Sequence, residues 1–303
     1  MTSPQVVWFG LVCGALSFAV PQGQKGIRTV AVARNIHMLV GSGGNVGISV
    51  GEDGVFMIDD KFAPLADQIK AAIKKLSPKP LRFLLNTHWH GDHTGGNERF
   101  GKTGAIIVAH ENVRKRMSVD SVIEALHRKV PASPKAALPV VTFTSDVTFH
   151  WNGDTIHAFH VPPAHTDGDV VVHFKKANVI HTGDVYFNGL YPFIDLSSGG
   201  SVLGVIRAAS RVIDLCDDKT KVIPGHGPLS DRAELIVYRD MLAAVRQRIV
   251  KLIEAGKSAD EAVAAHPTKD FDAKWGQGFL KPDIWTRIVY QSVLSSGTAR
   301  RKK

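Results

Sequence analysis

The apolar residues of the first part of the chain fall into short runs separated by turn residues, a pattern typical of β-strands. We expect strands at 28–34, 36–40, 45–50 and 55–59. The turn signals Gly41-Ser42-Gly43-Gly44 and Glu52-Asp53-Gly54 separate the later ones. The first part of the chain is therefore predicted to form short strands separated by turns.

In the next part of the chain, the spacing of apolar residues changes to that of a helix. A helix is predicted from 64 to 76, with Pro64 suited to its first turn. The run Leu81-Arg82-Phe83-Leu84-Leu85 is then strand-like, 92–100 should start a short helix, and 105–109 should be a strand followed by a short helix after His110. Strands and helices therefore alternate, which is typical of an α/β protein.

The remainder of the chain repeats this plan of strands followed by helices. Residues 131–139 hold three prolines and predict a mobile loop between two halves. Strands at 140–150, 154–161, 169–174 and 178–182 are expected to form a second sheet. Helices are predicted at 202–215 and at 231–255, the second capped by Ser230.

The ends of the chain are interpreted separately. Residues 6–20 are mostly apolar and suit the core of a signal peptide, with Ser17-Phe18-Ala19 as small residues for cleavage, although residues 1–5 lack Lys and Arg. A core strand and an uncleaved anchor are the alternatives. We predict a signal peptide and flexible mature start over 1–24 and a single domain over 25–303. The protein would then be periplasmic or secreted, or cytoplasmic if the segment is not a signal, with no stable membrane span after cleavage.

The last part of this domain, about 257–296, is predicted to be a packed helical cap rather than a dimer or substrate surface. Its aromatic residues carry that prediction: Phe271, Trp275, Phe279, Trp285 and Tyr290. Monomer and homodimer both stay open.

Composition narrows the class of protein. The chain has 303 residues, 44% of them hydrophobic, so it can bury a large core. Two cysteines exclude a disulfide scaffold, and neither has a metal-type spacing. The net charge of +9 raises the question of nucleic acid, but the basic residues are diffuse and no aromatic-interleaved basic stripe occurs. We expect a small-molecule substrate instead.

The chemistry is concentrated after the strand at 81–85. There, His88, His90, Asp92 and His93 lie within six consecutive positions. Imidazole and carboxylate are ligands that zinc and related ions prefer. His88 and His90 share one face of an extended segment and can grip one metal, while Gly91 lets the chain turn so that Asp92 and His93 can face a second.

Three further candidates follow short apolar runs: His165, Asp184 and His226. Ligands gather at such strand ends in α/β sheets. Nine other histidines are interpreted as surface or hydrogen-bonded core residues: His37, His110, His127, His150, His157, His160, His173, His181 and His266. His181 is the best of these for a supporting role, because it lies three residues before Asp184.

The pattern His-x-His-x-Asp-His, together with the later candidate ligands, resembles that of the metallo-β-lactamase superfamily over about residues 28–230. The resemblance implies a four-layer αβ/βα sandwich of two mixed sheets flanked by helices. It implies that His88, His90 and His165 hold one metal, that Asp92, His93 and His226 hold another, and that Asp184 lies between or beside them. Asp59 matches an acidic position that braces the metal loops in this family.

The resemblance also implies a mechanism. Two zinc ions, with iron or manganese as alternatives, would lower the pKa of a bridging water to about 7, and the resulting hydroxide would attack a carbonyl carbon. Asp92 would orient the nucleophile and pass a proton to the leaving atom. His90 excludes the flavin-linked di-iron relatives, which carry a carboxylate there.

The substrate is less defined by the resemblance. β-Lactamases usually have Cys or Ser where Asp184 stands, whereas lactonases and glyoxalase II-like thioesterases keep Asp. Phe187 occupies a position where many lactamases have a Lys that holds the drug, and Tyr186 or Tyr191 could offer a hydroxyl to an oxyanion, with aromatic packing as the alternative. Weighing the export signal, we favour a secreted β-lactamase-like zinc hydrolase that opens a cyclic amide or ester. The alternatives are a lactonase or thioesterase, and a mononuclear iron oxidoreductase of the persulfide dioxygenase type.

Overall fold

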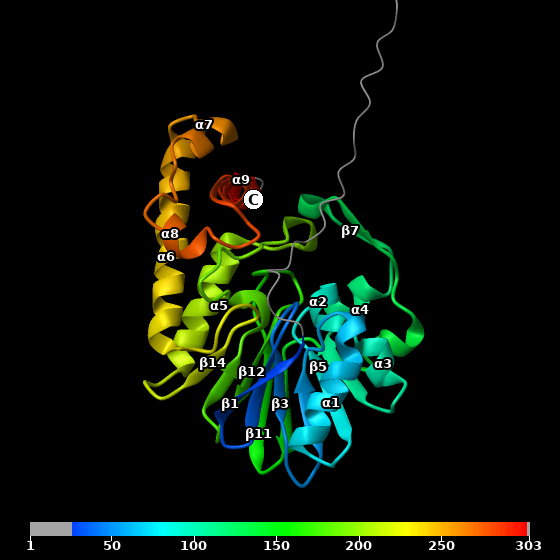
Figure 1. Ribbon diagram of the computed structural model, residues 1–303. Helices are drawn as coiled ribbons and strands as arrows, with labels where there is room; N and C mark the ends of the chain where they lie inside the picture. Colours follow the sequence, from blue (N-terminus) through cyan, green and yellow to red (C-terminus); the bar gives the residue numbers. More distant parts are fainter. Residues whose placement is uncertain (1–25, 302–303) are drawn as a thin grey trace, which may run out of the picture.

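Two mixed β-sheets face each other in the structure, a computed structural model that describes residues 26–301 (Figure 1). The first sheet has the order β1-β2-β3-β4-β5-β6-β9 and the second the order β10-β11-β12-β13-β14-β15. The strands of the first are β1 (Arg28–Ala33), β2 (Ile36–Val40), β3 (Val46–Ser49), β4 (Val55–Ile58), β5 (Leu81–Asn86), β6 (Ile106–His110) and β9 (Val141–Phe143). Those of the second are β10 (Asp146–Trp151), β11 (Asp154–His160), β12 (Val170–Phe174), β13 (Val179–His181), β14 (Lys221–Ile223) and β15 (Ser230–Asp231).

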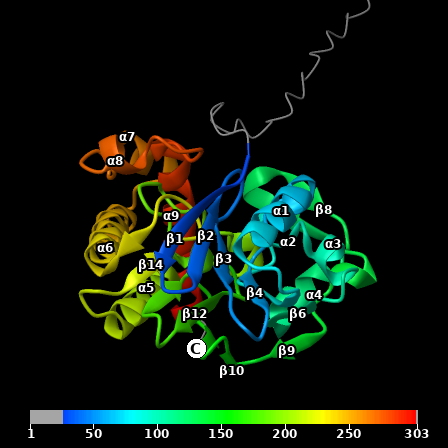
Figure 2. The same ribbon diagram turned by 60° about the horizontal axis from the view of Figure 1, so that its bottom comes forward.

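Helices cover the outer face of each sheet (Figure 2). The first sheet carries α1 (Ala66–Leu76), α2 (Gly91–Thr94), α3 (Asn97–Gly101) and α4 (Glu111–Met117). The second carries α5 (Val202–Leu215) and α6 (Arg232–Glu254), onto which α7 (Ala259–Ala264), α8 (Asp272–Trp275) and α9 (Pro282–Arg301) pack. The predicted α/β sandwich of two mixed sheets flanked by helices is confirmed.

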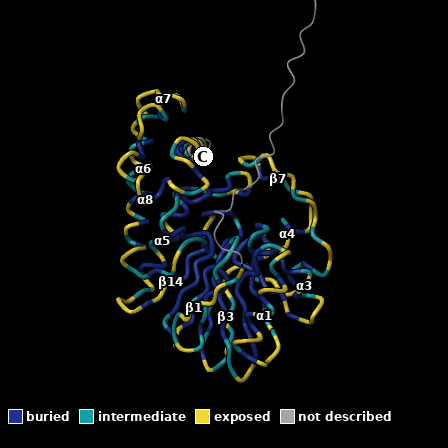
Figure 3. The backbone as a smooth tube through the Cα atoms, in the orientation of Figure 1, coloured by how far each residue is buried: buried dark blue, intermediate teal, exposed yellow. Residues whose placement is uncertain are grey.

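The sheets are held together by apolar side chains that meet between them. Phe56 and Leu85 of the first sheet belong to one buried cluster with Ile156, Val172 and Ile223 of the second. Strand β4 is buried along its whole length because it lies between this cluster and α1. Figure 3 shows the buried strands at the centre and the exposed loops around them.

Strand direction brings the loops of interest to one edge. Strands β4, β5, β6 and β9 run parallel, and so do β13 and β14. Their carboxyl ends therefore point the same way within each sheet, and the loops that follow them can converge.

The predicted strand at 140–150 is wrong as a single element. It is two strands, of which β9 pairs with β6 in the first sheet and only β10 joins the second. Apolar residues keep the same alternation in both strands, at 141, 143, 147 and 149, and only Ser145 interrupts it where the chain crosses between the sheets. The cap of α6 is also corrected: Asp231, not Ser230, accepts from the backbone N–H of Glu234.

The proline-rich segment 131–139 does not lie between the halves, because it joins two parts of the first half. It contains a short helix, η3 (Lys135–Ala137), and is anchored on the helices beside it. The Asn97 amide donates to the Ala137 carbonyl at 2.8 Å, and the Ser133 N–H donates to the Met117 carbonyl at 2.7 Å. The hairpin that precedes it, β7 (Ser121–Ile123) and β8 (Arg128–Val130), was not predicted.

The C-terminal helices form the packed cap that the aromatic residues predict. Trp275, Trp285 and Tyr290 are buried in one cluster with α5 and α6, whereas Phe279 is 47% exposed. None of the helices within residues 26–301 has the length and apolar character needed to cross a bilayer. The predicted signal segment lies outside the described residues.

Candidate metal centre

The histidine-rich motif begins where β5 ends. Strand β5 ends at Asn86, residues 87–89 form bends, and α2 begins after His90, so Asp92 and His93 lie in the first turn of that helix. The extended segment predicted for His88 and His90 is therefore wrong, because the chain already bends between the strand and the helix. The turn into α2 separates the first pair of candidate ligands, His88 and His90, from the second pair, Asp92 and His93. Gly91 lies at the bend, between the two pairs of candidate ligands.

The scattered candidates come from loops of the second half. His165 lies between β11 and β12, Asp184 in the 3₁₀ turn η4 (Gly183–Val185) after β13, and His226 in the loop after β14. All three meet the motif across the gap between the sheets. A single site is therefore assembled from both halves of the fold.

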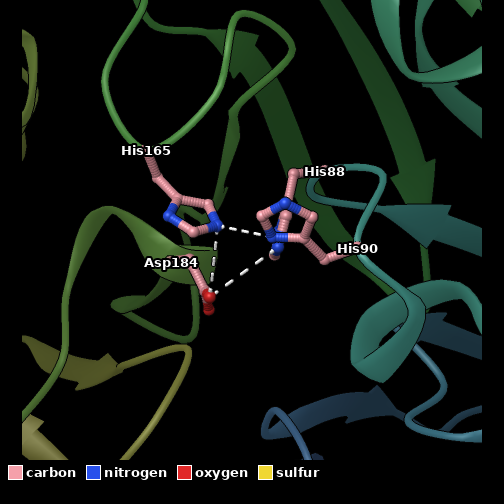
Figure 4. A group of neighbouring side chains, drawn as sticks. All are labelled: His88, His90, His165 and Asp184. Carbon is pink, nitrogen blue, oxygen red and sulfur yellow. Dashed lines mark hydrogen bonds and ion pairs between the residues drawn. The ribbon is translucent and has the colours of Figure 1, made fainter. Parts of the chain in front are cut away.

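The first group consists of His88, His90, His165 and Asp184 (Figure 4). Its candidate ligand atoms lie within 4.8 Å of one another, and all four residues are buried. His165 Nε2 is 2.9 Å from His90 Nδ1 and 3.4 Å from Asp184 Oδ2. Three imidazole nitrogens and one carboxylate oxygen thus point at a common centre, which is a ligand set suited to zinc.

The second group consists of Asp92, His93 and His226. His226 Nε2 lies 3.3 Å from Asp92 Oδ2 and 3.4 Å from His93 Nε2. Asp184 also reaches this group, with its Oδ1 3.1 Å from His93 Nε2 and its Oδ2 3.4 Å from His226 Nε2. One carboxylate therefore lies between two groups that could each hold a metal ion.

Two orphaned atoms show that the residues fit such ions. His88 Nε2 and Asp184 Oδ1 are buried, and neither makes a well-directed hydrogen bond within the described residues, although Asp184 Oδ1 lies 3.1 Å from His93 Nε2. A buried polar atom without a partner is costly, and buried groups of this kind are otherwise almost always satisfied. A cation between these residues would satisfy both, so the donor set and its geometry fit a pair of divalent ions.

In each imidazole of the first group, one ring nitrogen points into the site and the other contacts a partner that fixes the ring. His90 Nε2 is 3.0 Å from Asp195 Oδ2, and His165 Nδ1 is 2.7 Å from the Phe193 carbonyl. His88 Nδ1 lies 3.1 Å from the Thr87 hydroxyl. Partners of this kind set the ring orientation and raise the basicity of a metal-binding histidine.

Asp59 braces the second group. Its Oδ2 is 2.7 Å from His93 Nδ1 and accepts from the Thr87 hydroxyl, while its Oδ1 accepts from the Thr87 N–H. The carboxylate therefore ties the start of the histidine motif to its end. Asp59 adopts a positive φ of 60° to reach this place, a strained conformation for a residue with a Cβ.

His181 supports the site less directly. It is fully buried, its Nε2 is 3.2 Å from the Asn45 carbonyl, and its Nδ1 accepts from the Gly183 N–H. These bonds fix the turn that presents Asp184. Burial lowers the pKa of His181 to about 4, so the ring is neutral at physiological pH.

A glycine-rich loop at residues 41–45 covers the second group, and the sequence did not assign it a role. A Cβ built on Gly44 would lie 2.1 Å from His93 Cε1, so only glycine fits against that ring. Asn45 donates to the carbonyls of Pro224 and Gly227 beside His226 at 3.0 and 2.9 Å. The fully buried Lys61 ammonium donates to the Gly44 carbonyl and holds the loop from below.

Electrostatics separate the two groups. Burial lowers the pKa of His88 well below its usual range and also lowers that of His165, so both rings are neutral, the form that binds metals. Burial would also lower the pKa of His226, but Asp184 and Asp92 outweigh it and raise the pKa to about 9. Ions that enter the second group must therefore displace protons.

The two tyrosines proposed for substrate contact are buried within the fold. The Tyr186 hydroxyl lies 2.9 Å from Ser230 Oγ, and the Tyr191 hydroxyl donates to Asp272 at 2.8 Å. Their hydroxyls are thus used by interior partners, which favours the alternative of aromatic packing. Phe187, next to Tyr186, stacks on the His226 ring with centroids 4.8 Å apart.

Comparison with known proteins agrees with this architecture. A family model described as the metallo-beta-lactamase superfamily matches residues 39–226, more than half of the chain. The chain therefore belongs to the metallo-β-lactamase superfamily. With its two ligand groups, it is a metal-dependent hydrolase of that superfamily.

Individual relatives differ in their substrates. A hydroxyacylglutathione hydrolase of Pelagibacter ubique (strain HTCC1062) is 24% identical over 210 residues, which cover 66% of this chain and 77% of the relative. An acyl-coenzyme A thioesterase of Bos taurus is 23% identical over 170 residues, covering 52% and 60%. A metallo-beta-lactamase from Pontibacter korlensis has a similar structure, with a TM-score of 0.59, 20% identity, and coverage of 72% of this chain and 99% of its own. At that identity the structural likeness shows the fold alone.

Proposed function

We propose that this protein is a dizinc hydrolase whose preferred substrates are thioesters or esters rather than lactams. The position of Asp184 carries the proposal, because its two carboxylate oxygens lie between both ligand groups. In the resemblance described above, an aspartate at this place is typical of thioesterases and lactonases. Two relatives with thioester substrates in their names support the same choice.

The sequence alone favours a β-lactamase-like substrate. The surroundings of the site weaken that preference, since Phe187, at the position of the lysine that holds the drug in many lactamases, stacks on His226. An apolar ring at this place offers no charge to a lactam carboxylate. Lactam hydrolysis is therefore the alternative to be tested rather than the expected activity.

The chain would contribute metal ligands and the residues that brace them. Zinc, when bound, supplies a Lewis acid and a water of lowered pKa. His88, His90, His165 and Asp184 would hold one ion, and Asp92, His93 and His226 the other, with Asp184 shared between them. The braces Asp59 and Asp195 would keep the rings in place during turnover.

Asp92 would handle the proton. Burial favours its neutral form, but His93 and His226 outweigh that effect and hold the pKa of Asp92 well below its usual range. Asp92 is therefore a carboxylate at neutral pH, and its side chain is 23% exposed toward the open side of the site. It can orient an incoming water, accept its proton and pass it to the leaving sulfur or oxygen.

A substrate panel on purified, zinc-loaded protein tests the proposal. S-Lactoylglutathione, an acyl-coenzyme A, an acyl-homoserine lactone and nitrocefin would be compared at equal enzyme concentration. We expect thioesters or the lactone to be cleaved with the highest kcat/KM. Hydrolysis of nitrocefin alone would overturn the choice of substrate.

Metal analysis tests the reaction class. About two zinc ions per chain are expected for a dinuclear hydrolase. One iron per chain, together with oxygen consumption in the presence of a persulfide, would instead support the oxidoreductase alternative.

Export remains part of the proposal as a prediction from residues 1–24. Sequencing the N-terminus of the protein recovered from its native host tests it. A mature start near Pro21 or Gln22 supports cleavage, and an intact Met1 contradicts it.

A further inference from the structure

We propose that Arg128, on the β7–β8 hairpin, binds an anionic group of the substrate, a carboxylate or a phosphate, beside the metal centre. This inference rests on the proposed function, because it names the class of thioester or ester that the site prefers.

The register of the hairpin turns Arg128 toward the body of the protein. Arg128 pairs with Ile123, which is 4% exposed, whereas the neighbouring Lys129 pairs with Val122, which is 42% exposed. Residues directly opposite in an antiparallel pair share a face, and successive residues alternate. Arg128 therefore lies on the inner face of the hairpin and Lys129 on the outer face.

The guanidinium of Arg128 extends over the metal-binding loop. Among the described residues, and apart from the chain neighbours and helix backbone next to Gly91, only Arg128 Nη2 lies within 4 Å of a Cβ built on Gly91, at a distance of 3.9 Å. Gly91 stands between His90 of the first group and Asp92 of the second. A side chain at Gly91 would therefore point into open space next to the Arg128 guanidinium.

The hairpin is attached to the site at its far end as well. The N–H of Glu124, at the start of the hairpin turn, donates to Ser197 Oγ at 3.3 Å, and the Ser197 hydroxyl donates to Asp195. Asp195 in turn braces His90 at 3.0 Å. These bonds connect the hairpin to a brace of the metal centre, and Figure 1 shows β7 above α2 and α4.

Space for a substrate group exists next to this contact. A hollow of about 170 Å³ lies between the metal loop and the segment 130–137 that follows Arg128, lined in part by Trp89, Gly91, Met117 and Val130. Arg116 also lines it, but that guanidinium is bound by Asp167 through two bonds of 2.7 and 2.8 Å. The Arg128 guanidinium, in contrast, has no hydrogen bond or ion pair with any described residue, whereas its backbone pairs with Ile123.

An unpaired guanidinium offers a planar fork of donors that matches a carboxylate or phosphate in geometry and charge. The second ligand group is open on the same loop, since Asp92 and His226 are 23% and 21% exposed at their side chains. A substrate could therefore place its scissile carbonyl at the metal groups and its anionic end at Arg128. Positive charge at this place would also favour the approach of anions.

Three thioesters that share one acyl group test this assignment. Butyryl-N-acetylcysteamine is neutral, butyryl-3-mercaptopropionate carries a carboxylate and butyryl-coenzyme A carries phosphates, and the released thiol is measured in each case. We expect Arg128→Gln to raise KM about tenfold for at least one charged substrate, which corresponds to about 1.4 kcal/mol. The kcat values and the KM of the neutral substrate should change less than twofold.

Lys129→Gln is the matched control, because it removes the same charge from the outer face of the same hairpin. It should leave all three KM values within twofold. The charged substrate that responds to Arg128→Gln identifies the group that is bound. An equal effect of Arg128→Gln on the neutral and charged substrates, or no effect on any, overturns the assignment.

A second measurement separates this inference from the proposed function. If wild-type protein cleaves no thioester, metal-free protein is titrated with succinate and with inorganic phosphate while the Arg128 Nε–H signal is followed by NMR, assigned by its absence in Arg128→Gln. A saturable shift at millimolar anion supports the anion site even though the proposed substrate class fails. The lack of any shift overturns it.

Discussion

The two ligand groups of the metal centre differ in how deeply they are buried. The members of the first group lie inside the protein, with His88 1% and His165 0% exposed. In the second group, only His93 is buried, and Asp92 and His226 are exposed by about a fifth of their side chains. The first group is therefore built to hold an ion, and the second is open to a substrate.

The supports of the two groups differ in the same way. The three imidazoles of the first group are oriented by a carboxylate, a carbonyl and a hydroxyl. The second relies on Asp59 for His93, on a stacked ring for His226 and on the 41–45 loop above them. The buried first group is thus suited to holding a metal ion, and the more exposed second group to contact with molecules from solvent. Substitutions in each group can test this difference.

Removal of a ligand from each group should have the largest effect. We expect His88→Ala to lower kcat/KM by at least about 10³-fold, because the Lewis acid contribution of the first ion is worth several kcal/mol. His226→Ala should reduce bound zinc from two ions to one while the remaining ion keeps its affinity. Zinc content by mass spectrometry and circular dichroism measure both variants, with the exposed His150→Ala as control. Full activity of His88→Ala with one ion lost would contradict the dinuclear mechanism.

Substitution of the glycine above the second group should destabilise the fold. In Gly44→Ala the added methyl group would overlap the His93 ring, so we expect the free energy of unfolding to fall by about 1–3 kcal/mol. Gly91→Ala is the matched control, because its methyl group meets only Arg128 at 3.9 Å. Urea denaturation of both metal-free variants compares them. Equal stability of the two would mean that the 41–45 loop moves easily away from His93.

Removal of the brace on His90 should weaken the first group alone. Asp195→Asn keeps the shape of the side chain but loses the charge that orients the ring, and we expect the affinity for the tighter zinc to fall by about 10- to 100-fold. Competition with a chromophoric chelator measures the affinity. An unchanged tight site would show that burial, rather than Asp195, positions His90.

The smallest effect is expected at Tyr186. Because its hydroxyl is bonded to Ser230 inside the protein, Tyr186→Phe should leave kcat and KM within twofold and cost about 1 kcal/mol of stability. Steady-state kinetics and thermal unfolding measure the two quantities. A tenfold loss of kcat would return this tyrosine to the list of substrate-contact candidates.

The contiguous part of the site could be predicted from the sequence because its geometry is local. A strand followed by His88, His90, Asp92 and His93 has few possible arrangements. The structure groups the first two and the last two as expected, although residues 87–89 form bends rather than an extended segment. The prediction of the later ligands, such as His165 and His226, depended on the order in which the family's ligands occur, since a single histidine in a loop carries little information. The structure brings all of them to one point.

Other features could not be predicted because they depend on tertiary contacts. Asp195 follows an ordinary apolar run, and only the fold shows that it meets His90 across 105 residues. The change of sheet between β9 and β10 interrupts the hydrophobic alternation only at Ser145, which is a weak signal. The strands of the β7–β8 hairpin have three residues each, too few for a periodic pattern to mark them or the inner position of Arg128.

Asn45 has a consequence for the order of events during folding. Its amide bonds the carbonyl of Pro224, 179 residues further along the chain, and so closes one of the longest loops in the protein. Contacts of such separation form late, because the entropy of closing the loop must be overcome first. The complete ligand set therefore exists only after both halves have docked, and added zinc should act on the finished protein, slowing its opening rather than guiding its assembly.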